Sequence, residues 1–304
     1  MFFKHTDGPR LPPVSSVVDL SGRRHNPKEK DCTQKMTQLL DIECDFANAP
    51  LMLALAQVTF TQSPEVLQRI TEIKAGLCEI GLPVAETKQK MRVSMSFGGT
   101  PPKVGQEIFW WFSSLDRKRA VAISPTSIVV YDGRYTRFDE FCKLTTDVIK
   151  LAAKAAGNGC FLTTASLRYV SGFPCEEIPS RFLVAGLHGI PTNDFQTDHF
   201  HHEYNFWCST ATGGRLVLNA KTVHGNELIP KDVMSVGVGL DDKFSLKKEV
   251  DAVQLDIHET IQKKKLEKVD PCVVEMLFRE MRTHIKTAFL TATTPLAHTK
   301  WQIR

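Results

Sequence analysis

The stretch from Thr136 to Phe173 constrains the fold most, because it joins a helix pattern to a strand pattern through a glycine stop. Thr136, followed by Asp139 three residues later, predicts a capping pair at the start of a helix. The apolar positions that then share one helical face are Phe138, Phe141, Thr145, Val148, Ala152 and Ala155. Gly157-Asn158-Gly159 predicts the end of that helix, since glycine adopts left-handed backbone at little steric cost. Residues 161–170 alternate between two faces, which is typical of a strand.

The part of the chain before this stretch predicts one strand, one helix and four short strands. Residues 51–60 are apolar on both faces at first, which favours a central, covered strand. Ser63-Pro64 predicts a helix start, and Gly81-Leu82-Pro83 its end. The spacing of turn residues then predicts a meander of four antiparallel strands, at Arg92–Phe97, Glu107–Ser113, Arg119–Ser124 and Ser127–Tyr131.

The part from residue 160 onward predicts a similar order of elements. Its strand at 161–170 is followed by a short helix within Glu176–Leu187. Four further strands are expected, at Phe200–Cys208, Gly214–Lys221, Met234–Leu240 and Val253–Glu259. The glycine-rich third of these equally fits a loop. Asp270-Pro271 predicts the start of a last helix that buries Val274, Leu277, Met281, Ile285 and Phe289.

These elements indicate an α+β fold, in which a curved antiparallel sheet carries helices on one face. Two copies of a strand–helix–four-strand–helix unit would resemble the TATA-binding-protein-like or helix-grip class, by order of elements only and with no implication of DNA binding. We expect an irregular N-terminal arm at 1–46, a first half at 47–159 and a second half at 160–304 that shares one sheet with the first. The proline-interrupted arm is expected to pack on the domain or on another subunit, or to be partly disordered.

The composition is that of an ordinary soluble globular protein. The 304 residues are 42% hydrophobic and 24% charged, and the net charge of +4 neither requires nor excludes an acidic partner. No apolar run approaches the roughly 20 residues that span a bilayer. The eight cysteines form no C-x-x-C pair, so we expect reduced thiols in a cytoplasmic protein. Nucleotide-binding and common hydrolase motifs are absent from the sequence.

The central region resembles a sporadically distributed family of uncharacterised bacterial and archaeal proteins. The matching positions of its W-x-F-x-S/T-x-D-G pattern are Trp110, Phe112, Ser114 and Asp116, with Arg117 in place of the glycine. Tyr135 and Phe138 match its helix start, and Leu167–Val170 matches its L-R-Y-I strand, with Ser171-Gly172 replacing Asn-Arg. The resemblance spans 47–301 and implies no activity or catalytic residue. The patchy distribution of the family implies a prokaryotic mobile or defence-type system.

A cluster of histidine and acidic residues at 194–203 is the densest chemical signal. In a strand at 200–208, His199, His201 and Glu203 would share one face, and Asp198 could add a further ligand. Two imidazoles and a carboxylate at this spacing suit zinc, iron or manganese. The alternative interpretation is a solvated strand face, or an exposed loop, that binds nothing.

Three further residues are candidates for binding a partner: Arg168, Tyr169 and Trp111. A mid-strand arginine either binds an anionic ligand or forms an internal salt bridge, for which Asp256 is the expected partner. Tyr169 lies beside it in the strand that carries the family resemblance. Trp110 and Trp111 are expected to place one ring on each face of the sheet, and an exposed ring would mark an interaction surface.

Two basic runs, at Arg117-Lys118-Arg119 and Lys263-Lys264-Lys265, are expected in a hairpin tip and in a loop before the last helix. The sequence therefore favours a non-enzymatic binding or accessory protein that engages a protein, a peptide or a second copy of itself and needs no cofactor. The alternative is a metal-dependent enzyme that uses residues 198–203 and a divalent ion. Nucleic-acid binding through the basic turns is a third, weaker hypothesis.

Overall fold

A computed structural model describes residues 50–94, 103–157, 159–174, 181–187, 202–224, 228–234, 237–244 and 251–301. Residues 44–304 form one compact unit; the other unit, residues 1–43, lies outside the described residues, as does the predicted arm at 1–46. Within the described part, no helix is both long and apolar enough to cross a bilayer.

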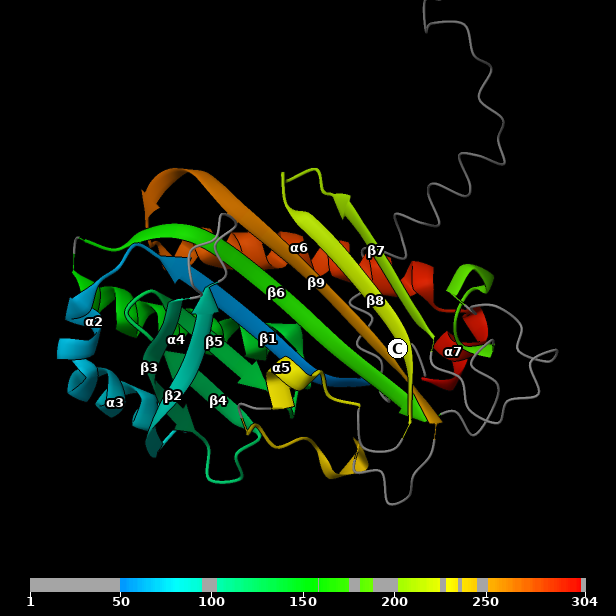
Figure 1. Cartoon of the computed structure of the whole chain (residues 1–304), viewed down its shortest axis with the longest axis horizontal. Coiled ribbons are helices and arrows are strands. Elements are labelled where there is room, and N and C mark those ends of the chain that lie inside the picture. Colours follow the sequence, from blue (N-terminus) through cyan, green and yellow to red (C-terminus); the bar gives the residue numbers. More distant parts are fainter. Residues whose placement is uncertain are drawn as a thin grey trace, which may run out of the picture. The chain divides into compact units, whose positions relative to one another are not determined.

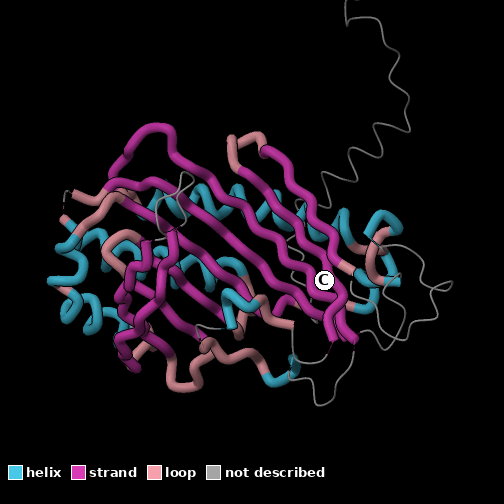
Figure 2. Tube along the Cα trace, viewed as in Figure 1, coloured by secondary structure: helices cyan, strands magenta, loops and turns pink. Residues whose placement is uncertain are grey.

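The compact unit is built on one open antiparallel sheet of nine strands (Figures 1 and 2). The strands are β1 (Leu51–Phe60), β2 (Val84–Ser94), β3 (Lys103–Ser113), β4 (Arg119–Ile123), β5 (Ser127–Asp132), β6 (Phe161–Pro174), β7 (Glu203–Ser209), β8 (Arg215–His224) and β9 (Asp251–Lys268). Their order across the sheet is β2-β3-β4-β5-β1-β6-β9-β8-β7. The α+β class with an antiparallel sheet, predicted from the sequence, is therefore confirmed.

The helices are α2 (Pro64–Gln68), α3 (Ile70–Glu79), α4 (Phe138–Ala156), α5 (Lys231–Met234), α6 (Pro271–Ala292) and α7 (Pro295–Lys300), with short 3-10 turns η2 (Ala185–Leu187) and η3 (Asp242–Phe244). The two long ones, α4 and α6, lie against the same face of the sheet (Figure 1). We call this the helix face and the opposite one the open face.

The larger hydrophobic core fills the space between the helix face and these helices. All six apolar-face positions predicted for α4, from Phe138 to Ala155, are buried. In α6, Val274, Met281 and Ile285 are buried as predicted, together with Phe278, while Leu277 and Phe289 are only partly buried. A smaller core on the open face gathers around Met52, Leu53 and Trp111, where Val233 of α5 packs. Helices therefore do not lie on one face only, because the short α5 covers part of the other.

The starts of the helices confirm one predicted cap and correct another. The Asp270 side chain accepts a hydrogen bond from the backbone N–H of Cys272 (2.8 Å), so it caps α6 as expected. The predicted capping pair of Thr136 and Asp139 is wrong. Arg137 occupies the capping position of α4, but its side chain does not cap the helix, and the hydroxyl of Thr136 donates to Glu140 (2.8 Å).

The predicted repeat of four strands in each half is not found in the described residues. Met234 ends the short helix α5, and residues 237–240 form no strand, so the expected strand at Met234–Leu240 is wrong. The first meander strand begins at Val84, well before the expected Arg92. Strand β9 runs on to Lys268, so Lys263-Lys264-Lys265 lies in a strand, whereas a loop was expected. Of the helix expected within Glu176–Leu187, residues 175–180 are outside the described part and only η2 is seen.

Two neighbouring glycines give a matched test of why α4 ends where it does. Gly157 has φ +66° and ψ −134°, a conformation that L-residues rarely adopt, whereas Gly159 has no positive φ and open space around its Cα. We expect Gly157→Ala to lower the free energy of unfolding by about 1–3 kcal/mol. Gly159→Ala should change it by less than about 0.5 kcal/mol. Urea unfolding of both variants measures the difference, and equal effects would contradict this account.

Candidate functional site

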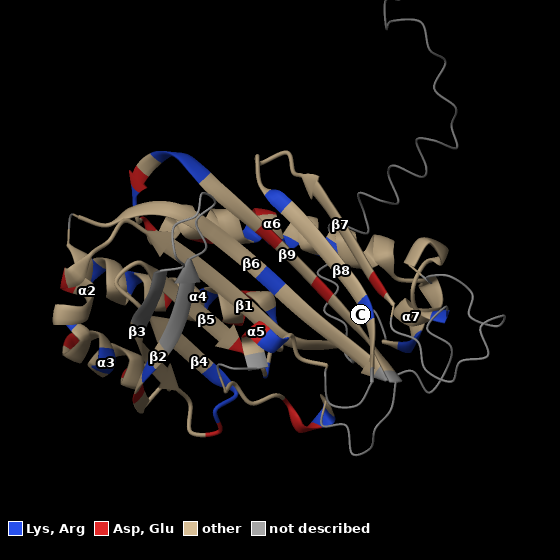
Figure 3. Ribbon diagram, in the orientation of Figure 1, with Lys and Arg blue, Asp and Glu red and all other residues tan. Residues whose placement is uncertain are grey.

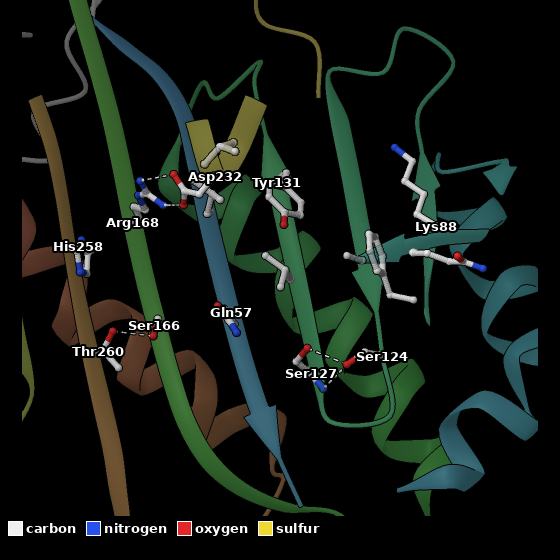
Figure 4. A pocket seen from close by; sticks show the side chains of 16 residues that line it. Gln57, Lys88, Ser124, Ser127, Tyr131, Ser166, Arg168, Asp232, His258 and Thr260 are labelled. Carbon is white, nitrogen blue, oxygen red and sulfur yellow. Dashed lines mark hydrogen bonds and ion pairs between the residues drawn. The ribbon is translucent and has the colours of Figure 1, made fainter. Parts of the chain in front are cut away.

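A polar cleft of about 610 Å³ lies at the centre of the open face (Figure 4). Side chains of β2, β3, β4, β5, β1, β6 and β9 line it, and α5 adds Asp232 and Val233. The helices α4 and α6 occupy the other face, and most of the polar side chains that line the cleft are partly exposed. Residues from both halves of the chain meet here, because β1 and β6 are the strands through which the two halves join.

The register of the sheet arranges the floor of the cleft in two cross-strand rows. One row runs Tyr131, Leu55, Arg168 and His258, and the other runs Val129, Gln57, Ser166 and Thr260. Directly opposite residues of antiparallel strands place their side chains on the same face. The pairing of β1 with β5 and β6, and of β6 with β9, therefore brings together groups that are far apart in the sequence.

Arg168 is the most strongly held side chain of the cleft. Its Nε and Nη2 atoms donate to the two carboxylate oxygens of Asp256 at 2.9 and 2.7 Å. Its Nη1 and Nη2 atoms donate to Asp232 of α5 at 2.6 and 3.3 Å. The predicted ion pair with Asp256 is confirmed, and Asp232 is a second partner that the sequence did not indicate. Burial acts against the charged form of Arg168, but the bonds to both carboxylates outweigh it and raise its pKa.

The hydroxyl groups of the cleft are bonded to one another. Ser166 and Thr260 are 2.8 Å apart between their oxygens, and Ser124 and Ser127 are 2.9 Å apart (Figure 4). In the described part of the chain, His258 makes no hydrogen bond with any of these four hydroxyls. Each of these hydroxyls thus bonds to another hydroxyl of the cleft, and among the described residues none bonds to an imidazole.

Two polar groups of the floor are left without a protein partner among the described residues. The Nδ1 atom of His258 is buried and makes no hydrogen bond, and the amide of Gln57 makes none. Burial lowers the pKa of His258 below its ordinary value, so its imidazole is neutral near pH 7. A neutral imidazole and an amide both donate and accept hydrogen bonds, which suits neutral polar ligands.

The other ionisable side chains of the cleft, Lys88 and Tyr131, add little net charge to it. Lys88 lies over the ring of Trp111, 4.2 Å from its centre, and 3.8 Å from Glu86. Burial lowers the pKa of Lys88, although Glu86 opposes this shift. Burial also raises the pKa of Tyr131, so its phenol stays protonated over the physiological range.

The structure does not bring the three predicted binding residues into one site. Only Arg168 lies in the cleft. Trp111 is on the same face but is 1% exposed, beneath Lys88 and against Tyr131. Tyr169 points to the helix face, where its hydroxyl lies 3.3 Å from that of Tyr135 and burial raises its pKa. As predicted, Trp110 lies on the face opposite Trp111, where it stacks with Phe112.

The predicted metal cluster falls largely outside the described residues. Asp198, His199 and His201 belong to the part of the chain that is not described, and Glu203 is the exposed first residue of β7. Among the residues that are described, no group of three His, Cys, Asp or Glu side chains is placed to hold a metal ion. The metal hypothesis therefore stays a prediction.

The first basic run does form a hairpin tip, between β3 and β4, as expected. All three of its members contact carboxylates: Arg117 with Glu86 at 2.6 Å, Lys118 with Asp242 at 3.3 Å and Arg119 with Asp132 at 3.0 Å. Figure 3 shows the second run on the far end of β9, and Lys263 contacts Glu267 at 2.9 Å. Both runs are thus partly neutralised within the fold.

Sequence reasoning missed Gln57, His258, Asp232 and Lys88 as cleft residues. Each is an ordinary polar residue in its own segment, and only the strand order brings them together. The alternation of residues 253–259 does place Asp256 and His258 on one face of the strand and Leu255 and Ile257 on the other. The sequence thus predicts the face on which each side chain lies, but it does not predict which strands are neighbours.

Comparison with known protein families and with curated proteins gives no match for this chain. The family resemblance inferred from residues such as Leu167–Val170 therefore stays a prediction, and the function has to be argued from the geometry.

The two carboxylates on Arg168 should contribute very differently to stability. The side chain of Asp256 is 6% exposed and that of Asp232 is 62% exposed. We expect Asp256→Asn to lower the free energy of unfolding by about 3 kcal/mol, because it removes one charge from a buried pair. Asp232→Asn should cost less than about 1 kcal/mol, since solvent screens that pair. Urea denaturation decides, and an equal loss in both variants would contradict the assignment.

His258 should make the protein less stable in mild acid. Its pKa is lower in the folded state than its ordinary value of about 6.5, so the unfolded chain binds more protons between the two values. The free energy of unfolding should therefore fall as the pH drops below about 6.5, and fall less in His258→Gln. Urea unfolding from pH 7.5 to 5 measures both slopes. An identical slope in the variant would show that His258 does not titrate this way.

Proposed function

We propose that this chain is a binding or accessory protein without catalytic activity, and that it holds an uncharged polar segment of a protein partner in the open-face cleft. The observation that carries the proposal is the pair of unbonded groups in the floor, the His258 Nδ1 atom and the Gln57 amide. An extended peptide offers amide N–H and C=O groups in alternation, which match an imidazole and a side-chain amide.

The charges of the cleft support a neutral ligand. Arg168 is matched by Asp256 and Asp232, and Lys88 lies beside Glu86. An anionic ligand would have to compete with two carboxylates for Arg168, at the cost of leaving a buried Asp256 without its partner. Phosphate-rich partners are disfavoured for this reason.

The shape of the site supports a segment of a larger partner. A volume of about 610 Å³ lies in the middle of the range for small-molecule sites, but here the site extends across side chains of seven strands of the sheet, with α5 at its border. We further propose that the two halves repeat one unit: outward from the centre, β1-β5-β4-β3-β2 is mirrored by β6-β9-β8-β7, which is shorter by one strand. The cleft then lies where the two repeats meet.

The cysteines support a reducing compartment. Cys78, Cys142, Cys160, Cys208 and Cys272 are free thiols, and burial raises the pKa of Cys142 and Cys160 to about 11, which makes both unreactive. We propose the cytoplasm as the place of action.

A peptide array tests the proposal directly. Wild-type protein is expected to bind a subset of arrayed decapeptides that are rich in neutral polar residues. Gln57→Ala and His258→Phe should each weaken the best peptide about fivefold to tenfold in fluorescence anisotropy, as expected for one lost hydrogen bond. Affinity should change by less than about threefold between 50 and 500 mM salt, because no net charge is neutralised.

Gln262→Ala is the matched control. Gln262 is exposed on the same strand as His258 but does not line the cleft. Its replacement should leave the affinity unchanged. Unaltered binding by both cleft variants, or no peptide bound by the wild type, would refute the proposal. A steep salt dependence would favour the nucleic-acid hypothesis instead.

A further inference from the structure

The edge strand β7 carries the largest concentration of exposed apolar side chains among the described residues. Tyr204, Phe206 and Trp207 are 36%, 44% and 61% exposed, within a strand of seven residues. Glu203 is its only charged residue. Natural sheet edges are normally protected by charge, proline or a bulge, and β7 has only this one charge at its first residue, with no proline and no bulge within its bounds.

The strand presents a row of backbone groups that point away from the sheet. His202 and Thr210 form hydrogen-bonded pairs with Thr222 and Gly214 of the neighbouring chain segment, both at 2.9 Å. Because such pairs alternate along an antiparallel ladder, the residues between them at odd positions direct their N–H and C=O groups outward. Within the described part of the chain, the outward groups of Asn205, Trp207 and Ser209 bond to nothing.

A groove of about 550 Å³ lies on the helix-face side of this edge. Tyr204, Phe206 and Cys208 form one wall, and small residues of α6, such as Ala288, line it with Thr287 and Thr291. Figure 1 shows α6 passing behind β7 at this edge of the sheet. One more strand beside β7 would cover both the groove and the outward backbone groups.

We propose that this strand is β7 of a second copy of the chain, paired antiparallel around a two-fold axis at Phe206. In that register Asn205 faces Trp207 of the other copy, and Trp207 faces its Asn205. In this register the residues with outward backbone groups, which have odd numbers, lie opposite odd-numbered residues of the other copy. Their N–H and C=O groups can therefore form hydrogen bonds without a bulge. The pairing does not depend on the peptide cleft, which lies at the middle of the sheet.

In this register the side chains of β7 in one copy lie opposite side chains of β7 in the other copy that suit them. Phe206 meets Phe206 of the second copy, and Tyr204 meets its Cys208, on the helix-face side where the groove lies. The second strand thus brings apolar side chains to an apolar groove. Glu203 faces Ser209, so the only charge of the strand meets no like charge. Other pairings that shift the strands by one residue would turn the outward groups away from each other.

The first test removes one outward donor and leaves the pairing of β7 with β8 intact. Proline is tolerated in an edge strand where its nitrogen faces outward, so Asn205→Pro should fold normally, and Asn205→Thr is the matched control that keeps the N–H. Sedimentation velocity should show a wild-type dimer. Asn205→Pro should raise its dissociation constant about 30-fold or more, since the two-fold axis doubles each lost bond, while Asn205→Thr should leave it within about threefold.

The second test reads the register directly and does not need a proline variant to fold. At a non-hydrogen-bonded antiparallel pair the Cα atoms are about 4.5 Å apart, which allows a disulfide. Phe206→Cys should therefore yield an oxidised dimer on a non-reducing gel. Trp207→Cys, which faces Asn205, should not, and neither should the wild type with its native cysteines.

A monomeric wild type up to tens of micromolar would overturn the proposal, as would an Asn205→Pro dimer as tight as the wild type. A wild-type monomer whose β7 edge binds a different chain would assign the edge to another partner and equally refute pairing with a second copy. Crosslinking through Trp207→Cys in place of Phe206→Cys would show a different register from the one proposed.

Discussion

The pairing of β1 with β6 is the interaction on which the rest of the structure depends. Among the described strands it is the only place where the two halves join, and it fixes the register on both sides of the centre. Residues 51–56 are almost entirely buried because both faces of β1 are covered, by α4 and α6 on one side and by the α5 region on the other. A shift of one residue here would turn Arg168 toward the helix core and Leu167 toward solvent.

Alternation along the central strands then divides the chemistry of the protein between two faces. Leu167 packs under the helices while Arg168, its neighbour, meets Asp256 and Asp232 on the open face. A buried arginine is costly unless its donors are satisfied, and the two carboxylates satisfy it from different elements. The network therefore links β6, β9 and α5, and it sets one end of the cleft while Gln57 and His258 remain available in the floor.

The sequence predicted the periodic elements and missed the contacts that depend on strand order. The buried faces of α4 and α6, the central position of β1 and the pair of Arg168 with Asp256 all follow from local spacing and from the cost of an isolated charge. Asp232 could not be found this way, since it belongs to a four-residue helix just before the strand predicted at Met234–Leu240, and its contact with Arg168 depends on the fold. The extension of β9 through Lys263-Lys264-Lys265 was missed because a run of lysines normally indicates a solvated loop.

The two edge strands of the sheet, β2 and β7, differ in the side chains that they carry. Edge strand β2 includes Lys88, Lys90 and Arg92, which is the usual composition of an edge that must stay unpaired. Edge strand β7 has aromatic residues at comparable positions and belongs to the half that is shorter by one strand. The same sheet thus has one edge strand whose sequence is basic and one whose exposed aromatic side chains have, among the described strands, no neighbour on the outer side. Since exposed apolar edges promote uncontrolled association, the exposed aromatic side chains that the described residues show at β7 favour a defined occupant.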